Sequence, residues 1–251
     1  MSKFSVALLT LVFTLPVISA RSQETPPVTE APSFSGKSID QMTADEVLKL
    51  VRFSYTLYNR DFTGSLRMGL TKKVDFLLSL KPDSIRFVFN DPAQVIYIDT
   101  RNQRFSLLEG VAGAEMKPVP AAKYGEPVRG TDITYDDLSM RFLYWPNARI
   151  VREEKLKGRD TIHLSVRNPD GAGAYSSVNI WIDKISGGLL KMIGYDRGGR
   201  PIRRFEVLSG KKFGDIWMVD EMRIETISGP VGANDGTVKS STRMQIKAPA
   251  N

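Results

Sequence analysis

The clearest helical pattern in the chain begins at residue 43. Thr43 and Glu46 are spaced as the two members of a capping box, in which each side chain binds a free backbone amide at a helix start. Apolar residues including Val47, Leu50 and Val51 follow at three- and four-residue spacing. Because this spacing puts them on one side of a helix, the pattern predicts an amphipathic helix over residues 44–58.

Beyond residue 60 the apolar residues recur every second position, as they do in half-buried strands. Leu66 and Met68, for example, alternate with Ser65 and Arg67. The predicted strands lie near 65–70, 73–80, 85–89, 95–98, 103–108, 149 and beyond, 161–166, 178–183, 188–193, 202–209, 215–228 and 237–247. We therefore expect eleven or twelve short strands in an antiparallel meander. No fixed repeat or linker-like stretch interrupts them, which favours a single domain over 39–248.

A second capping box, Thr134 with Asp137, predicts a short helix over 135–143. The preceding segment, 110–133, is rich in Gly, Pro and Ala, and we expect it to be a long surface loop. Two short helices cannot cover both faces of so wide a sheet. Some strands are nevertheless apolar on both faces, such as 95–98. The pattern thus indicates a curled, mostly antiparallel sheet whose concave face is completed by helices or by a ligand.

The N-terminus has the pattern of a secretory signal peptide. A basic residue, Lys3, precedes an apolar run from Phe4 to about Ile18, which is shorter than the ~20 residues of a spanning helix. We predict a signal peptide over 1–20, cleaved after Ala20 or alternatively after Ser22, with an uncleaved anchor as the alternative. Residues 21–38 are Pro-rich and are predicted to be a disordered linker. The expected location is periplasmic or secreted.

Composition narrows the chemistry. The 251 residues include no Cys and one His, and the formal net charge is +7. Without Cys the chain has no disulfide framework, thiolate metal site or lipid-modified N-terminal Cys. The basic residues are scattered among acids, which argues against nucleic-acid binding; contact with anionic lipid head groups needs only diffuse charge. We predict no metal and no cofactor.

Catalytic groups are also few. His163 alternates with Ile162 and Leu164, so we predict a half-exposed strand residue. Asp136 and Asp137 diverge by about 100° on a helix and are predicted to act as helix-start and capping residues. No pair of acids stands out as a glycosidase site. We expect a protein that is not an enzyme.

At Tyr135-Asp136-Asp137-Leu138-Ser139, with Phe142 and Trp145, the chain resembles the outer-membrane lipoprotein-sorting, LolA-like family, in a divergent branch. Weaker matches, which together with this motif span about 45–247, are Phe62-Thr63-Gly64, Ile180-Trp181-Ile182-Asp183, Leu189-Leu190-Lys191 and Tyr195-Asp196. The resemblance implies an α+β fold, an incomplete (unclosed) antiparallel barrel of about eleven strands curled over two or three short helices. It also implies a hydrophobic cavity for acyl chains of lipoproteins or other lipids.

The function expected on this basis is a periplasmic carrier, active as a monomer, between an inner-membrane donor complex and an outer-membrane acceptor. Predicted cavity residues are Met68, Phe76, Leu78, Phe87, Phe89, Tyr97, Phe142, Trp145, Trp181, Met192, Met218 and Met222, with Arg67 and Arg86 as cationic contacts at the rim or lid. Flexible Met side chains suit a wall that adapts to different chains. The alternatives are plain core for these residues, and a sensor or scaffold that binds a protein partner, or a carboxylate-dependent envelope hydrolase, for the protein.

Overall fold

The computed structural model describes residues 37–56, 59–101, 104–213 and 216–247. The predicted signal peptide and nearly all of the predicted linker lie outside the described residues.

The elements in chain order are η1 Ile39–Gln41, α1 Ala44–Thr56, β1 Arg60–Met68, β2 Lys72–Lys81, β3 Ser84–Phe89, β4 Gln94–Asp99, β5 Ser106–Gly110, β6 Lys117–Pro118, η3 Ala121–Lys123, η4 Val128–Gly130, α2 Tyr135–Ser139, η5 Arg141–Tyr144, β7 Arg149–Leu156, β8 Arg159–Arg167, β9 Ser177–Asp183, β10 Leu189–Tyr195, β11 Pro201–Phe213, β12 Ile216–Ser228 and β13 Thr237–Lys247; η marks a single-turn 3-10 helix.

The described residues form one sheet of thirteen antiparallel strands. Sequential strands pair within two meanders, β1–β6 and β7–β13, and the β1–β13 pair joins the two meanders. The edge strands β6 and β7 do not pair with each other, so the sheet curls without closing. The predicted fold, an incomplete antiparallel barrel over short helices, is confirmed. Among the described strands, β6 is the one that the sequence pattern does not predict, because it is a two-residue strand in a segment without alternation.

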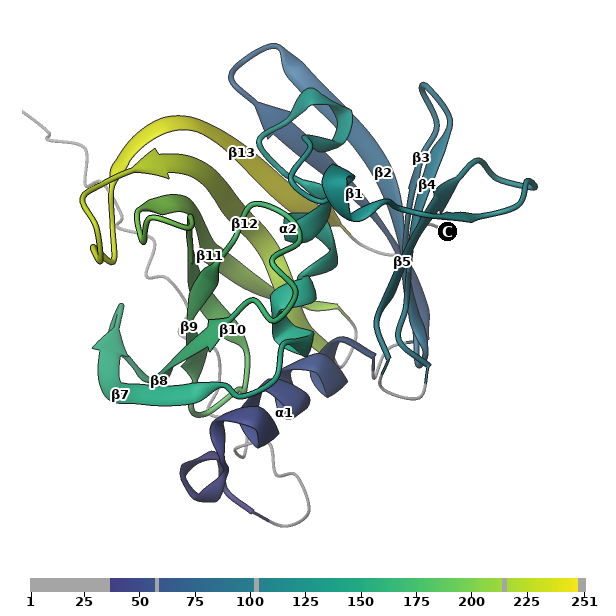
Figure 1. The fold of residues 1–251 in the computed structure, drawn as a ribbon. Helices are drawn as coiled ribbons and strands as arrows, with labels where there is room; N and C mark the ends of the chain where they lie inside the picture. The colour runs from purple at the N-terminus through teal and green to yellow at the C-terminus, as the bar shows by residue number, and fades with distance from the viewer. Residues whose placement is uncertain (1–36, 57–58, 102–103, 214–215, 248–251) are drawn as a thin grey trace, which may run out of the picture.

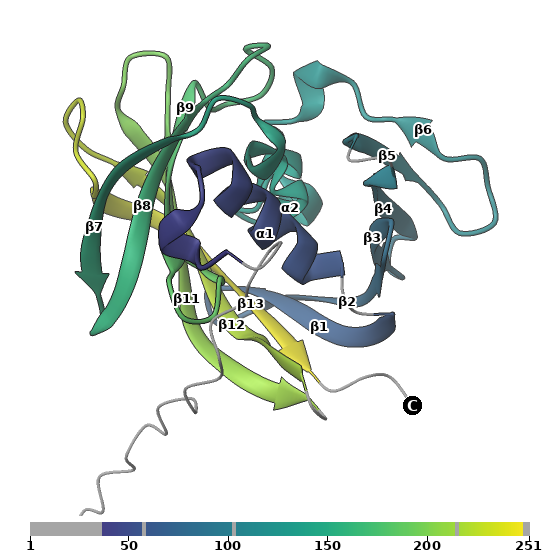
Figure 2. The ribbon, with the colours of Figure 1, turned by 90° about the horizontal axis from the view of Figure 1, so that it is seen from below.

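The segment between the two edge strands carries η3, η4, α2 and η5, and α2 lies inside the curl (Figure 2). The prediction that 110–133 is a surface loop is therefore wrong for part of this segment, because Val119, Val128 and Ile133 are buried. The predicted helix over 135–143 is divided. Met140 has a left-handed backbone, with φ of 46°, and it ends α2 before the 3-10 turn η5 begins.

The first predicted helix is confirmed as α1. The Thr43 amide donates to Glu46 Oε2 at 2.8 Å and the Glu46 amide donates to Thr43 Oγ1 at 3.3 Å, so both halves of the capping box form. Val47, Leu48 and Val51 are buried. In Figure 2, α1 lies across the mouth of the curled sheet, with α2 behind it. It contacts η5, β2 and β7.

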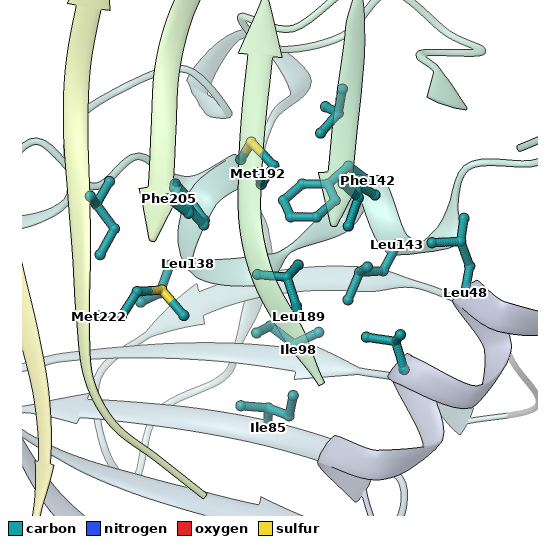
Figure 3. Close-up of a cluster of buried hydrophobic side chains, with 14 of the residues drawn as sticks. Leu48, Ile85, Ile98, Leu138, Phe142, Leu143, Leu189, Met192, Phe205 and Met222 are labelled. Atoms are coloured by element: carbon teal, nitrogen blue, oxygen red, sulfur yellow. The ribbon is translucent and has the colours of Figure 1, made fainter. Parts of the chain in front are cut away.

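The core fills the space between the concave face of the sheet and the helices. Figure 3 shows side chains from α1, from α2 and η5, and from strands of both meanders converging there, among them Leu48, Leu138, Phe142 and Phe205. Gly64 on β1 lets the ring of Phe76 lie against the backbone, since a Cβ at this position would be 2.3 Å from the Phe76 ring. The apolar interior is thus shared by the helices and both halves of the sheet.

Candidate functional site

Most of the predicted cavity residues meet in the concave interior. Those within the core cluster are Phe76, Leu78, Phe87, Phe89, Phe142, Trp145, Met192 and Met222, and Met218 packs against the cluster. Met68 is half-buried and lies two residues beyond Leu66, on the same face of β1. The structure therefore gathers these side chains in one apolar region, and their contact with a ligand stays a prediction.

The remaining predicted site residues lie on the other side of the sheet. Ile96 and Ile98 are in the interior, so the intervening Tyr97 points outward, where it is half-buried. Trp181 belongs to a separate small cluster on the convex face, with Ile193, Tyr195 and Ile227.

Arg67 and Arg86 are exposed. They share the convex face, because Arg86 pairs in register with Tyr97, and Arg67 follows the buried Leu66. None of these four side chains faces the concave interior.

Several interior residues were not among the predicted site residues, including Leu48, Leu138, Leu189 and Phe205. Phe205 has a sequence signal, since it alternates with Arg204 and Glu206 in β11. Leu48 has a weaker one, because it lies beside the apolar stripe of α1. Leu138 belongs to the predicted helix over 135–143 and to the Tyr135–Ser139 motif, but it is not among the predicted cavity residues.

The interior is closed in this structure. The core side chains are nearly all buried and pack against one another. Two surface depressions, of about 350 and 320 Å³, lie elsewhere: one between residues 121–125 and 171–174 beside Arg197, the other beside β7 and β8. No residue of the core cluster lines either depression. Occupation of the interior by a ligand therefore requires an element to move.

Buried charges tie α2 to the sheet. Asp137, in the first turn of α2, is fully buried, and the Arg203 Nε lies 3.2 Å from its Oδ2. The Tyr175 hydroxyl donates to Asp137 Oδ1, and Arg203 also donates to Thr226 Oγ1 at 2.6 Å. Burial raises the pKa of Asp137, and the charge of Arg203 offsets this only in part. Burial alone would lower the pKa of Arg203, but Asp137, Tyr175 and Asp132 together outweigh burial and raise that pKa.

Further polar contacts fix the two sides of α2. The buried Arg141 Nε lies 2.9 Å from Asp136 Oδ1, and Arg141 also donates to the Ala172 carbonyl at 2.7 Å. The Tyr135 hydroxyl donates to Glu109 Oε2 of β5 at 2.7 Å. Just before α2, Asp132 accepts from Thr242 Oγ1 of β13 at 2.9 Å. The prediction of structural roles for Asp136 and Asp137 thus agrees with the contacts, and α2 is attached to both meanders.

Helix α1 is attached to the rest of the protein mainly by apolar contacts, unlike α2. Its inward face is apolar, and its polar contacts lie near the surface. Asp45 Oδ1 accepts from the Ala148 amide at 2.9 Å, and the Arg52 guanidinium lies 5.1 Å from the centre of the Tyr144 ring. Burial lowers the pKa of Arg52. The ion pair of Glu46 in α1 with Lys37 lies at the surface, whereas the pairs of Asp136 and Asp137 in α2 are buried. Of the two helices, α1 is the one held mainly by apolar packing.

The prediction that His163 is half-exposed is wrong, since its exposed fraction is 1%. It faces the convex side, as its alternation indicates, but that side is covered locally. The imidazole stacks on Trp181 with ring centres 4.1 Å apart, and its Nδ1 lies 3.3 Å from Glu154 Oε1. Lys191 lies over the same Trp ring. Neither imidazole nitrogen has a hydrogen-bond partner among the described residues.

This burial predicts a pH dependence of stability. Burial lowers the pKa of His163 below 6.5, and Glu154 offsets this only in part. The unfolded chain therefore takes up the proton first as the pH falls, so stability is full above about pH 6.5 and declines below it, by at most about 1.4 kcal/mol per pH unit. Urea unfolding between about pH 8 and pH 5.5 measures this. His163→Phe keeps the stacked ring and should flatten the curve; an unchanged slope would contradict the assignment.

Two other kinds of feature are absent from the described part of the chain. No helix there has the length and apolar character needed to cross a membrane. In the same ranges, no group of three or more His, Asp or Glu side chains is arranged to hold a metal ion.

Several solved protein structures have a fold similar to this one. An outer-membrane lipoprotein-sorting protein domain from Vibrio parahaemolyticus superposes with a TM-score of 0.60 at 17% identity, covering 81% of this chain and 91% of that one. A DUF1329 family protein from Desulfovibrio piger gives 0.59 at 18% identity, covering 82% and 91%. A LolA superfamily protein from Nitrosomonas europaea gives 0.59 at 12% identity, covering 82% and 92%.

At these identities the likeness concerns the fold. Curated protein sequences give no match to the chain. A family model described as "uncharacterized protein" matches residues 113–248, which is more than half of the chain. The protein therefore belongs to this uncharacterised family and has the fold of LolA-like, outer-membrane lipoprotein-sorting proteins.

Proposed function

We propose that this protein binds acyl chains of lipids or lipoproteins between the concave face of its sheet and helix α1, and carries them through the periplasm. The observation that supports this most directly is the construction of the interior. One continuous apolar cluster lines an unclosed sheet, and its open side is covered by a single amphipathic helix that is held mainly by apolar packing.

Loading then requires α1 to leave its place while α2 stays. Moving α2 would separate the buried Asp137 and Arg203, and each charge would be left unpaired in an apolar region. Moving α1 exposes Val47, Leu48 and Val51, whose burial an incoming acyl chain would replace methylene by methylene, at about 0.8 kcal/mol each. An acyl chain can thus replace the apolar contacts of α1, but it cannot replace the buried ion pair that holds α2.

The proposed contacts are the interior residues of the predicted set. Met192 on β10 and the pair Met218 and Met222 on β12 offer flexible side chains within the C-terminal meander. The buried indole Nε1 of Trp145 has no hydrogen-bond partner among the described residues. It would serve as a donor to an ester or amide carbonyl at the head of an acyl chain. Tyr97, Trp181, Arg67 and Arg86 are left out of this proposed site.

The same proposal places the protein in the cell envelope. The signal-peptide pattern of residues 1–20 supports export, and the domain proposed for binding is 39–248. A carrier of this kind works without catalysis, receives its cargo from an inner-membrane donor and delivers it to an outer-membrane acceptor. We propose a monomer, because one chain supplies the sheet and its cover.

Native mass spectrometry tests the proposal. Protein purified gently from its own cell envelope should carry added mass that organic extraction releases as lipid or lipopeptide. The purified protein should also show a rise in melting temperature with a fluorescent acyl probe, because a ligand that binds only the folded state stabilises it. A clean unliganded mass, together with no thermal shift for any lipid or lipopeptide, would rule out the carrier function.

A further inference from the structure

The β1–β2 hairpin has an apolar tip. Leu70 lies at its turn and is completely exposed, at 106% of its reference area. The preceding Gly69 has φ of +60°, and a Cβ placed there would have no neighbour within 4 Å. The hairpin projects at the top of the molecule in Figure 1. A leucine is thus presented to solvent at the outermost point of a paired, nine-residue strand.

Cations follow directly behind this tip. Residues 66–74 contain Arg67, Lys72 and Lys73 and no acid. Lys73, Arg67 and Arg243 pair in register, so they form a row across β2, β1 and β13 on the convex face. All three side chains are exposed. Neighbouring strands lie about 4.8 Å apart, and like charges at that spacing repel unless nearby anions neutralise them.

The acids that compensate this row lie on its far side from the tip. Asp75 binds Lys73 at 2.6 Å, and Glu221 binds Arg243 at 3.0 Å. Arg67, in the middle, has no ion pair with any described residue. Lys72, closer to the tip, donates only to the Gly130 carbonyl, at 2.7 Å. From the tip inward the order is therefore apolar, cationic, then acidic.

This order matches the depth profile of a membrane interface. With about 3.3 Å per residue, Arg67 and Lys73 lie roughly 10 Å behind Leu70 along the hairpin. Apolar side chains of interfacial elements enter to about that depth, and cations remain beside the phosphates of anionic lipids. We propose that the β1–β2 hairpin docks this protein on an anionic lipid bilayer, with Leu70 inserted and Arg67, Lys72 and Lys73 at the head groups.

The docking surface is separate from the proposed lipid-binding interior, since Leu70 and Arg67 lie outside the core cluster. Each proposal therefore succeeds or fails without the other. The test is flotation of the purified full chain with phosphatidylcholine vesicles, with and without phosphatidylglycerol. We expect binding only to the vesicles that contain phosphatidylglycerol, and we expect it to weaken as salt is raised.

Matched variants distinguish the contribution of the hairpin tip to vesicle binding from that of the overall charge of the protein. Leu70→Asn should weaken vesicle binding at least about tenfold, because full burial of one leucine accounts for more than a factor of ten in a binding constant. Arg67→Gln should also weaken it. Val231→Asn and Lys155→Gln change an exposed apolar residue and an exposed cation elsewhere, and should leave it unchanged.

A tryptophan probe reports insertion itself. In a Leu70→Trp variant, the emission that exceeds that of the wild type should shift to the blue on anionic vesicles and be quenched by brominated acyl chains. Equal vesicle binding by wild type and Leu70→Asn would overturn the proposal. So would equal losses for Leu70→Asn and Val231→Asn, or binding to soluble poly-glutamate without binding to vesicles, which would assign the surface to an acidic protein.

Discussion

Oxidation of an Asp45→Cys, Ala148→Cys variant is expected to abolish acyl-chain binding, with a loss of more than about tenfold, or 1.4 kcal/mol. Asp45 in the first turn of α1 accepts from the Ala148 amide at 2.9 Å, so these positions are close enough for a disulfide to be attempted. The disulfide would fasten α1 over the interior. Because the chain has no native Cys, the introduced pair forms without competition.

The measurement is fluorescence titration with an acyl probe before and after reduction. Reduction should restore binding in the same sample, which separates locking of α1 from damage to the fold. A Lys155→Cys, Asp160→Cys variant is the matched control, since this exposed pair joins β7 to β8 and leaves α1 free. If the oxidised Asp45, Ala148 variant binds the probe as tightly as the reduced form, α1 is not the moving cover.

Arg203→Leu is expected to lower the free energy of unfolding by about 3–5 kcal/mol, the usual loss when one member of a buried ion pair is removed. The Asp137 carboxylate would keep the Tyr175 hydroxyl and the Thr134 amide as donors but would lose its only described cation. The loss should be larger at higher pH. Burial already raises the pKa of Asp137 in the folded protein, so ionisation of this carboxyl at higher pH destabilises the fold. Removal of Arg203 should strengthen this effect.

Urea unfolding at two pH values measures this effect. Arg243→Leu is the control, because its pair with Glu221 is exposed and should contribute less than about 1 kcal/mol. Adding Asp137→Asn to Arg203→Leu should recover part of the loss, since the buried charge is then removed. Equal effects of Arg203→Leu and Arg243→Leu would show that α2 is not held by its buried charges.

Much of the fold was predictable from the sequence, because capping boxes and the alternation of apolar and polar residues indicate its helices and strands. The capping boxes at Thr43 and Thr134 both form as their spacing predicts. Alternation located the long strands: the predicted strand at 237–247 is β13, Thr237–Lys247. Too few helices for so many strands indicated a curled sheet, and the residues inside the curl, such as Phe87 and Met192, follow from that alternation.

The wrong predictions concern burial: alternation indicates which face of the sheet a side chain is on, but not whether other side chains cover that face. The alternation predicts the correct face for His163 but not its burial, because Trp181 and Glu154 cover the imidazole. Tyr97 was selected as aromatic, although Ile96 and Ile98 take the inward positions of that strand. Period-two alternation fixes relative orientation along one strand only, and a second layer of side chains is decided by packing between segments distant in the chain.

Local periodicity was therefore sufficient for the class of fold, the two helix starts and most of the apolar interior, because capping and alternation act within a few residues. The pairing of β1 with β13, the placement of α2 inside the curl and the contact of Asp137 with Arg203 join residues far apart in sequence. Only the tertiary structure reveals such contacts, since their energies depend on burial that no local pattern records. These contacts attach α2 to the sheet, and for this reason we propose α1 as the element that moves.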